Sequence, residues 1–306
     1  MSDQSALSTQ HSAFFRSYMF VPGNSEKMLT KAISLQNLDL AMFDLEDGVP
    51  PGQKNDAREL VATMLGRAPG GPVRFVRINA IGTDRMEADL QAVLVPGVEG
   101  LALPKVEDAG QVLLVDRILA AREPSLGVAP GSIQMLVAIE SARGLLNAPS
   151  IAACSPRVMG LMFGAEDYGL DLGLPTNREG EARELLYARS AMVVAAASAH
   201  VQSVDGVWPE IHDFEGLRRD AVQARRLGFS GKSTFHPGQI DILNEIFSPA
   251  EADVDYARRV VEAFDAAQAA GQGSVAFGGQ LIDLPIVERA RRVLQLHESL
   301  AAPSSR

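Results

Sequence analysis

Eight short apolar runs, each ending in polar residues, glycine or proline, constrain the fold of this chain more than any other feature. They lie at residues 17–21, 38–45, 74–79, 100–104, 134–139, 158–163, 203–208 and 231–235. The stretches between them carry helical spacing, as at residues 184–199 and 217–227. Runs that are apolar on both faces and alternate with helices indicate parallel strands covered by helices.

Eight strand-helix units over this length match a (β/α)₈ barrel, which typically needs about 250 residues. The rival is a doubly wound open sheet. A Gly-x-Gly-x-x-Gly turn after the first strand would favour that rival, but the turn here reads Val21-Pro22-Gly23-Asn24-Ser25. We therefore predict an α/β fold with a TIM barrel over residues 16–248. Residues 1–15 are expected to form a disordered tail, and residues 249–306 a C-terminal helical extension that includes a flexible glycine-rich link.

Composition excludes several classes of function. The 306 residues are 46% hydrophobic and 22% charged, which is ordinary for a globular protein. The net charge of −10 argues against a general attraction to nucleic acid or to an anionic membrane, so an anionic ligand must be held by local cations. No run approaches the roughly 20 apolar residues that span a bilayer. A single cysteine, Cys154, excludes an internal disulfide and favours a reducing compartment, so we expect a cytoplasmic protein.

Two acidic residues follow neighbouring apolar runs, where a barrel places its active site. Glu140 comes directly after residues 134–139, and Asp167 comes four residues after 158–163. Two hard oxygen ligands on adjacent strands suit Mg²⁺, which fills its remaining positions with water and substrate oxygens. The alternative is that each carboxylate caps a helix or lies in a surface loop.

A second group of acids follows the second apolar run. Asp44, Glu46 and Asp47 form a dense negative cluster that could order cations or transfer protons, so Asp44 and Glu46 are candidate catalytic residues. The alternative is a solvated loop of helix-capping carboxylates. Lys54 and Arg58 follow nearby and could neutralise the cluster.

Arg77 lies at the end of the third apolar run, where an isolated cation would be costly. Its planar fork suits a substrate carboxylate. The alternative is a structural ion pair with one of the nearby acids. The same argument, that the cation binds a substrate carboxylate, applies to Arg16 and Lys105 with less support.

The turn after the first apolar run, with Asn24 and Lys27, resembles a strand-to-helix anion cradle. An ordinary capped helix explains it equally well. His236 precedes Pro237 and could be a general base or a metal ligand, but a structural histidine explains it equally well, so no chemistry is assigned to it.

Several ordered blocks make the chain similar to a known family. They are residues 16–24, 43–49, 76–79, 103–107, 139–142, 163–167, 228–232, 236–240 and 279–285. Together they resemble the citrate lyase β-subunit-like branch of the HpcH/HpaI aldolase superfamily, and within it the citramalyl-CoA lyase type.

The resemblance implies a TIM barrel that binds Mg²⁺ and makes or breaks a carbon-carbon bond between an acyl-CoA enolate and a keto acid. It places the metal carboxylates on Glu140 and Asp167 and the carboxylate-binding arginine on Arg77. It also places a catalytic carboxylate, contributed by a neighbouring subunit, on Asp283. Residues 249–306 would then be a flap that completes a neighbour's site in a homo-oligomer, a trimer or hexamer.

The expected function is a Mg²⁺-dependent lyase that cleaves or forms a 3-hydroxyacyl-CoA. Citramalyl-CoA or malyl-CoA would give acetyl-CoA and pyruvate or glyoxylate. Asp283 would move a proton at the acetyl carbon, Arg16 and Asn24 would help to bind substrate, and Lys27 and Lys31 would hold the CoA phosphates. The alternatives are an aldolase acting on free keto acids, a citryl thioester lyase subunit of citrate lyase β type, and a non-enzymatic subunit. Neither nucleic acid nor membrane is an expected partner.

Overall fold

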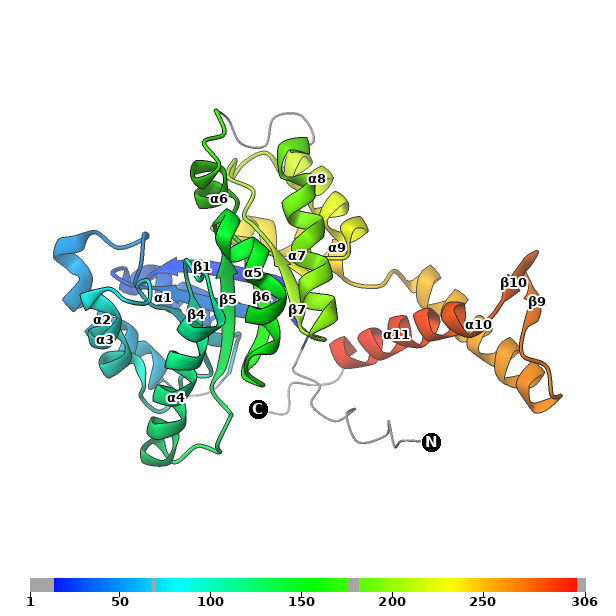
Figure 1. Ribbon diagram of the computed structural model, residues 1–306, viewed down its shortest axis with the longest axis horizontal. Helices are drawn as coiled ribbons and strands as arrows, with labels where there is room; N and C mark the ends of the chain where they lie inside the picture. Colours follow the sequence, from blue (N-terminus) through cyan, green and yellow to red (C-terminus); the bar gives the residue numbers. More distant parts are fainter. Residues whose placement is uncertain (1–13, 68–69, 176–181, 302–306) are drawn as a thin grey trace. The chain divides into compact units, whose positions relative to one another are not determined.

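The computed structural model describes residues 14–67, 70–175 and 182–301. These form two compact units, one of residues 15–245 and one that contains residues 246–301 (Figure 1). Most of the tail predicted at residues 1–15 lies outside the described residues. Within the described ranges, no helix is both long enough and apolar enough to cross a membrane.

The first unit is a closed barrel of parallel strands that follow one another in sequence order, with β1 paired to β8. The strands are β1 (Ser17–Pro22), β2 (Leu40–Asp44), β3 (Val73–Arg77), β4 (Gly100–Leu103), β5 (Gln134–Ile139), β6 (Val158–Phe163), β7 (Gln202–Asp205) and β8 (Gly231–Thr234). This confirms the predicted (β/α)₈ fold and excludes the doubly wound sheet.

Helices alternate with the strands around the barrel. They are α1 (Glu26–Ile33), α2 (Lys54–Leu65), α3 (Asp84–Val93), α4 (Ala109–Leu126), α5 (Ala142–Ala153), α6 (Ala165–Asp171), α7 (Leu186–Ser198), α8 (Phe214–Leu227) and α9 (Ile240–Phe247). Side-chain caps start several of them: Ser25 for α1, Asp108 for α4 and Ser141 for α5. Each cap satisfies a backbone N–H that the first helical turn leaves without a partner.

The barrel interior is filled by alternate residues of the strands. Leu40 and Met42 of β2, and Val73 and Phe75 of β3, belong to one buried apolar cluster with Leu136 and Ala138 of β5. Side chains two positions apart share a face of a strand. Asp44, Arg77 and Glu140 therefore continue the same inward-facing rows, at the carboxyl end where each apolar row stops.

The second unit is a helical hairpin with a small sheet. It contains α10 (Glu251–Ala269), β9 (Val275–Phe277), β10 (Gln280–Ile282) and α11 (Leu284–Ala301). Phe264, Ile282 and Val287 belong to its apolar core. Gly278 and Gly279 join the antiparallel strands with φ of 58° and 80°, which a two-residue turn with both φ angles positive requires and which glycine adopts without strain. Part of the expected flexible link is thus a tight hairpin.

Candidate active site

Arg77, which is partly buried, and the buried Asp44 form a bidentate ion pair at the carboxyl end of the barrel. Nε of Arg77 donates to Oδ1 of Asp44 at 2.8 Å, and Nη2 donates to Oδ2 at 2.7 Å. Burial lowers the pKa of Arg77, but the hydrogen bonds and charge of Asp44 outweigh it, so the net pKa is raised. The guanidinium also lies 4.6 Å from the centre of the Phe20 ring. Two of its five N–H groups donate to Asp44, which leaves donors that a ligand can use.

Asp44 is held on its other side by the backbone of its own loop. Its oxygens accept the N–H groups of Glu46 and Gly48, each at 2.8 Å. A Cβ at position 48 would lie only 2.3 Å from Oδ2 of Asp44. The close approach therefore requires glycine at this position, and the loop presents Asp44 to Arg77 in one orientation.

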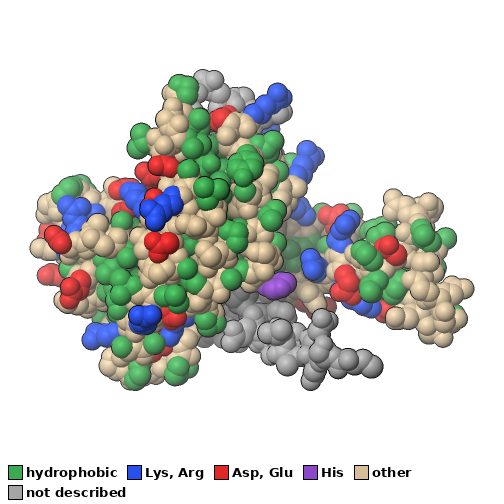
Figure 2. Space-filling view, in the orientation of Figure 1, with side chains coloured by type: hydrophobic (Ala, Val, Ile, Leu, Met, Phe, Trp, Pro, Cys, Tyr) green, Lys and Arg blue, Asp and Glu red, His purple; other side chains and the backbone are tan. Residues whose placement is uncertain are grey.

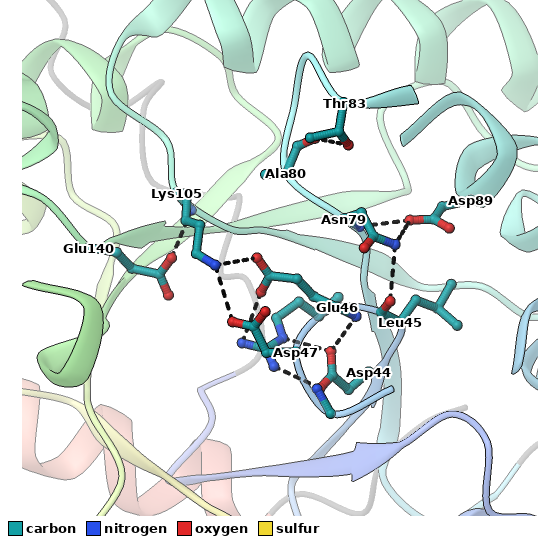
Figure 3. Close-up of polar contacts among 12 residues, drawn as sticks. Asp44, Leu45, Glu46, Asp47, Asn79, Ala80, Thr83, Asp89, Lys105 and Glu140 are labelled. Carbon is teal, nitrogen blue, oxygen red and sulfur yellow. Dashed lines mark hydrogen bonds and ion pairs between the residues drawn. The ribbon is translucent and has the colours of Figure 1, made fainter. Parts of the chain in front are cut away.

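Glu46, Asp47 and Lys105 form a second ionic group beside this pair, and most of these contacts can be followed in Figure 3. Nζ of Lys105 lies 3.0 Å from Oε1 of Glu46 and 3.1 Å from Oδ2 of Asp47. The other Glu46 oxygen, Oε2, is buried 3.2 Å from Nη1 of Arg77 and makes no hydrogen bond among the described residues. Burial raises the pKa of Glu46, although Arg77 and Lys105 oppose the shift.

Glu140 directly follows β5 and is 7% exposed. Its Oε2 accepts the backbone N–H of Lys105 at 2.9 Å (Figure 3). Burial, followed by the charges of Glu46 and Asp167, raises the pKa of Glu140 to about 7. Glu46 and Asp167 thus add negative charge beside the buried carboxylate of Glu140, an environment that favours binding of a cation.

Asp167 lies in the first turn of α6, which begins two residues after β6 ends, so it is helical rather than in a loop at the strand end. Between strand and helix stands Gly164, where a Cβ would lie 2.4 Å from Cγ of Glu140 and 2.6 Å from its Oε1. The absence of a side chain at position 164 leaves the space that the Glu140 carboxylate occupies.

The two carboxylates fit a hard divalent cation. Among the described residues, no group of three or more histidine, cysteine, aspartate or glutamate side chains could hold a metal. Mg²⁺ is commonly bound by one or two carboxylates and completes its octahedron with water and substrate oxygens. Glu140 and Asp167 are therefore an adequate protein ligand set for Mg²⁺ but not for a fully enclosed structural metal.

Lys54 and Arg58, which could neutralise the acidic cluster, form no ion pair with its carboxylates among the described residues, although the charge of Lys54 interacts with Asp44 and Glu46. Nζ of Lys54 donates to the backbone oxygens of Leu45 and Glu46, at 2.6 and 2.5 Å. Arg58 instead pairs with Asp89, with 2.7 Å between Nε and Oδ1. Both cations are used to fix loops, because a buried carbonyl or carboxylate left without a donor is costly.

Asn79 links the loops after β2 and β3. Its Oδ1 accepts from Nζ of Lys54 at 3.0 Å, and its Nδ2 donates to Oδ2 of Asp89 at 2.6 Å. A cavity of about 520 Å³ opens beside it. The cavity is lined by Glu46, Asp47, Asn79, Ala80, Gly82, Thr83, Asp84, Arg85 and Lys105.

Arg16 is the clearest departure from the predicted site. It directly precedes β1, at the amino end of the barrel, and it pairs with Asp39 through Nε at 2.9 Å and Nη2 at 2.7 Å. Because the strands are parallel, this end lies opposite Arg77. Arg16 is therefore not brought together with the other predicted site residues and forms an ion pair at the opposite end of the barrel.

The remaining predicted residues have simpler surroundings. Asn24 follows β1 and donates through Nδ2 to Oε1 of Gln53 at 2.5 Å. Lys27 and Lys31 are exposed on α1. Asp283 belongs to the C-terminal unit, where it is exposed and accepts the N–H of Ile286 through Oδ1 at 3.4 Å.

His236 accepts the N–H of Gly238 through Nδ1 at 3.1 Å, which agrees with its interpretation as a structural histidine.

Sequence reasoning missed three contributors to the site. Phe20 supports the guanidinium of Arg77, Gly164 makes room for Glu140, and the backbone of Lys105 binds Glu140. The period-two pattern could have indicated Phe20, since it faces inward with Tyr18. The other two depend on close contacts between segments that follow neighbouring strands, which the apolar pattern does not show.

The model of the family described as HpcH/HpaI aldolase/citrate lyase matches residues 16–237. The chain belongs to this family. Relatives include the citrate lyase subunit beta of Escherichia coli K12, 39% identical over 92% of this chain and 93% of that protein. The (3S)-malyl-CoA thioesterase of Cereibacter sphaeroides is 36% identical over 94% and 96%. Family and relatives identify the chain as a lyase, as the sequence predicts.

A solved structure of the same family supports the fold and the ligand prediction. CitE from Mycobacterium tuberculosis, in complex with magnesium, acetoacetate and coenzyme A, aligns with a TM-score of 0.76 at 30% identity. The alignment covers 94% of this chain and 99% of that one. The predicted ligands, Mg²⁺ and CoA as part of the substrate, are those of this neighbour.

Proposed function

We propose that the protein is a Mg²⁺-dependent lyase that cleaves or forms the carbon-carbon bond of a 3-hydroxyacyl-CoA, such as citramalyl-CoA or malyl-CoA. The products of cleavage are acetyl-CoA and a keto acid, pyruvate or glyoxylate. The observation that carries the proposal is that a series of contacts joins Arg77 and Glu140 at one barrel rim: Nη1 of Arg77 lies 3.2 Å from Glu46, Glu46 pairs with Lys105, and the backbone N–H of Lys105 donates to Glu140.

Glu140 and Asp167 would hold the metal. Bound there, Mg²⁺ supplies Lewis-acid stabilisation of the oxygen that carries negative charge as the carbonyl forms. Glu140 is held for this role by the N–H of Lys105 and by the space at Gly164.

Arg77 would bind the carboxylate of the keto-acid portion. Asp44 fixes the plane of the guanidinium, so its remaining N–H groups point in a defined direction. A fixed fork loses little side-chain entropy when a substrate binds, which favours a single orientation of the reacting bond. Asp44 therefore acts mainly by orienting Arg77, and Glu46 contributes negative charge beside it.

Asp283 of a neighbouring subunit would move the proton at the acetyl carbon. Its carboxylate is exposed and follows the hairpin of β9 and β10. Exposure suits a group that must meet a ligand from outside its own unit. The protein would then be a homo-oligomer, such as a trimer, with Asn24 near the substrate and the exposed Lys27 and Lys31 as partners for the CoA phosphates.

A second candidate is the citryl thioester lyase subunit of citrate lyase. It is favoured by the 39% identity to the citrate lyase subunit beta of Escherichia coli. The chemistry at the barrel rim is the same, and the two candidates differ in the acyl group and in its carrier.

The test is turnover of citramalyl-CoA, malyl-CoA and citryl-CoA by the purified protein with Mg²⁺. Keto acid and free CoA thiol are measured in parallel. Cleavage releases keto acid and acetyl-CoA without a free thiol, whereas thioester hydrolysis releases the thiol without keto acid. Keto acid from one CoA thioester, lost on addition of EDTA, is the expected result. Failure with all three thioesters, or thiol release alone, contradicts the proposal.

A further inference from the structure

Lys105 has a left-handed backbone conformation, which residues other than glycine rarely adopt. It follows β4 with φ of 53°, and the only other non-glycine residues with positive φ in the described ranges are Ala182 and His200. The left-handed region is strained for a residue with a Cβ. Such a conformation persists only where the surroundings enforce it, and it is frequent at functional sites.

The backbone of Lys105 contacts the end of β5. Its N–H donates to Oε2 of Glu140 at 2.9 Å, and the next N–H, of Val106, donates to the carbonyl of Ala138 at 3.4 Å. The left-handed turn therefore forms part of the connection between the loop after β4 and the end of β5. Glu140 is oriented by a backbone group, which a substitution at position 105 does not remove but can redirect.

The side chain of Lys105 reaches in another direction. Its ammonium group pairs with Glu46 and Asp47, in the loop after β2 (Figure 3). Lys105 thus contacts Glu46 and Asp47, which follow β2, and also Glu140, which follows β5. These two strands are not neighbours in the barrel. Without this cation, Glu46 and Asp47 would keep their negative charge beside Glu140 with less compensation.

We infer that Lys105 is a positioning residue with two separable actions: its left-handed backbone orients Glu140 toward the metal, and its ammonium group holds Glu46 and Asp47. The inference rests on the proposed function, because it assigns Glu140 to the metal. It goes further by dividing the contribution of one residue between its backbone conformation and its charge.

Two substitutions separate these actions. Both K105G and K105A remove the ammonium group, but only glycine adopts positive φ without strain. K105A is therefore expected to bind Mg²⁺ at least fivefold more weakly than K105G, as measured by titration calorimetry without substrate. K105G is expected to bind Mg²⁺ as tightly as the wild type or more tightly, because a competing cation is gone. In both variants kcat/KM falls at least tenfold, and K105R recovers part of it.

The matched control is H200G, which relieves positive φ (57°) at a residue just before β7, at the amino end of the barrel. It is expected to change neither Mg²⁺ affinity nor kcat/KM. Equal Mg²⁺ affinities for K105A and K105G overturn the inference, even if both melt at a lower temperature, since that result indicates a merely structural role.

The same measurements distinguish this inference from the proposed function. If the Mg²⁺ affinities separate as expected but no thioester is cleaved, only the proposed function fails. If thioesters are cleaved and the two variants bind Mg²⁺ equally, only the role of Lys105 fails. A wild-type protein that binds no Mg²⁺ contradicts both.

Discussion

At the scale of single residues, the site depends on close contacts between its charged side chains and the backbone around them. Arg77 and Asp44 are the last inward-facing residues of neighbouring strands and pair with each other, and the charge of Arg77 also interacts with Glu46 and Glu140. Glycine is required at positions 48 and 164 because a Cβ there would lie within 2.5 Å of an acidic side chain. Small residues here are as specific to the site as the charged ones.

Substitution of Gly164 by alanine tests this requirement. The added Cβ would lie 2.4 Å from Cγ of Glu140, which is not the far end of a flexible chain, so the carboxylate must move. We expect kcat/KM to fall at least about tenfold with weaker Mg²⁺ binding, since a 1 Å displacement of a site group can cost far more. The matched control is Gly52→Ala, where no atom lies within 4 Å of the added Cβ. Equal behaviour of the two variants would falsify the assigned role of Gly164.

Substitution of Arg77 by lysine tests the fork. Lysine keeps the charge but cannot bind two carboxylates in one plane. We expect KM for the acyl-CoA to rise at least about tenfold, while kcat falls less, because binding of the substrate carboxylate is lost in ground state and transition state alike.

Arg74→Lys is the control on the same strand, since Arg74 donates to the backbone carbonyls of Leu65 and Arg67. It is expected to lower stability without raising KM. A rise in KM for both variants would show that the effect is not specific to the fork.

At the scale of elements, buried ion pairs hold helices to the barrel. Arg189 of α7 and Asp220 of α8 meet Asp205 of β7 and Lys232 of β8 in one neutral cluster. Nζ of Lys232 lies 2.5 Å from Asp205 and 2.6 Å from Asp220, and its side chain is fully buried. Removing one charge leaves the others uncompensated.

Lys232→Met is therefore expected to destabilise the fold by about 3–5 kcal/mol in urea denaturation. The double variant Lys232→Met/Asp220→Leu restores neutrality and keeps the Arg189–Asp205 pair. It is expected to be more stable than the single variant. If the double variant is the less stable of the two, packing rather than charge balance dominates the cluster.

Glu123 of α4 provides a pH-dependent contribution to stability. It pairs with Arg157 and accepts the N–H groups of Gly131 and Ile133. The hydrogen bond from Arg157 is the main cause that lowers its pKa to about 2. Because the pKa of Glu123 is lower in the folded state than its unfolded value near 4.3, the ionised carboxylate stabilises the fold above that pH. This contribution is lost as the pH falls toward 2.

Glu123→Gln should therefore lower the free energy of unfolding by about 3 kcal/mol at pH 7. The difference in this free energy between the variant and the wild type should shrink steadily below about pH 4.5. Denaturation at several pH values measures it. A difference that is constant from pH 7 to pH 3 would show that the charge of Glu123 is not the source.

The limits of elements were predictable where apolar pattern and capping agreed. The runs at 134–139 and 158–163 coincide with β5 and β6. The hairpin of β9 and β10 escaped prediction because three-residue strands are too short to show alternation. Asp167 follows β6 as expected, and α6 begins so soon after β6 that its first turn includes this residue.

At the scale of the whole molecule, the proposal requires two subunits for one site. If Asp283 acts on a neighbour, Glu140→Gln and Asp283→Asn are each inactive alone, while mixed oligomers contain sites with both native residues. We expect partial recovery of activity after the two variants are unfolded and refolded together. Differently tagged variants and tandem purification establish that mixing occurred. No recovery in proven mixed oligomers counts against a shared site.

The sequence by itself determined the barrel and the candidate residues at its carboxyl rim, because the apolar runs, the helical stretches between them and the polar residues that follow each run can all be read along the chain. It could not determine which charges pair. Arg77 with Asp44, Arg58 with Asp89 and Arg16 with Asp39 are choices made between different strands and helices. Only the tertiary structure decided these pairs, because the packing of strands and helices determines which acid lies next to each cation.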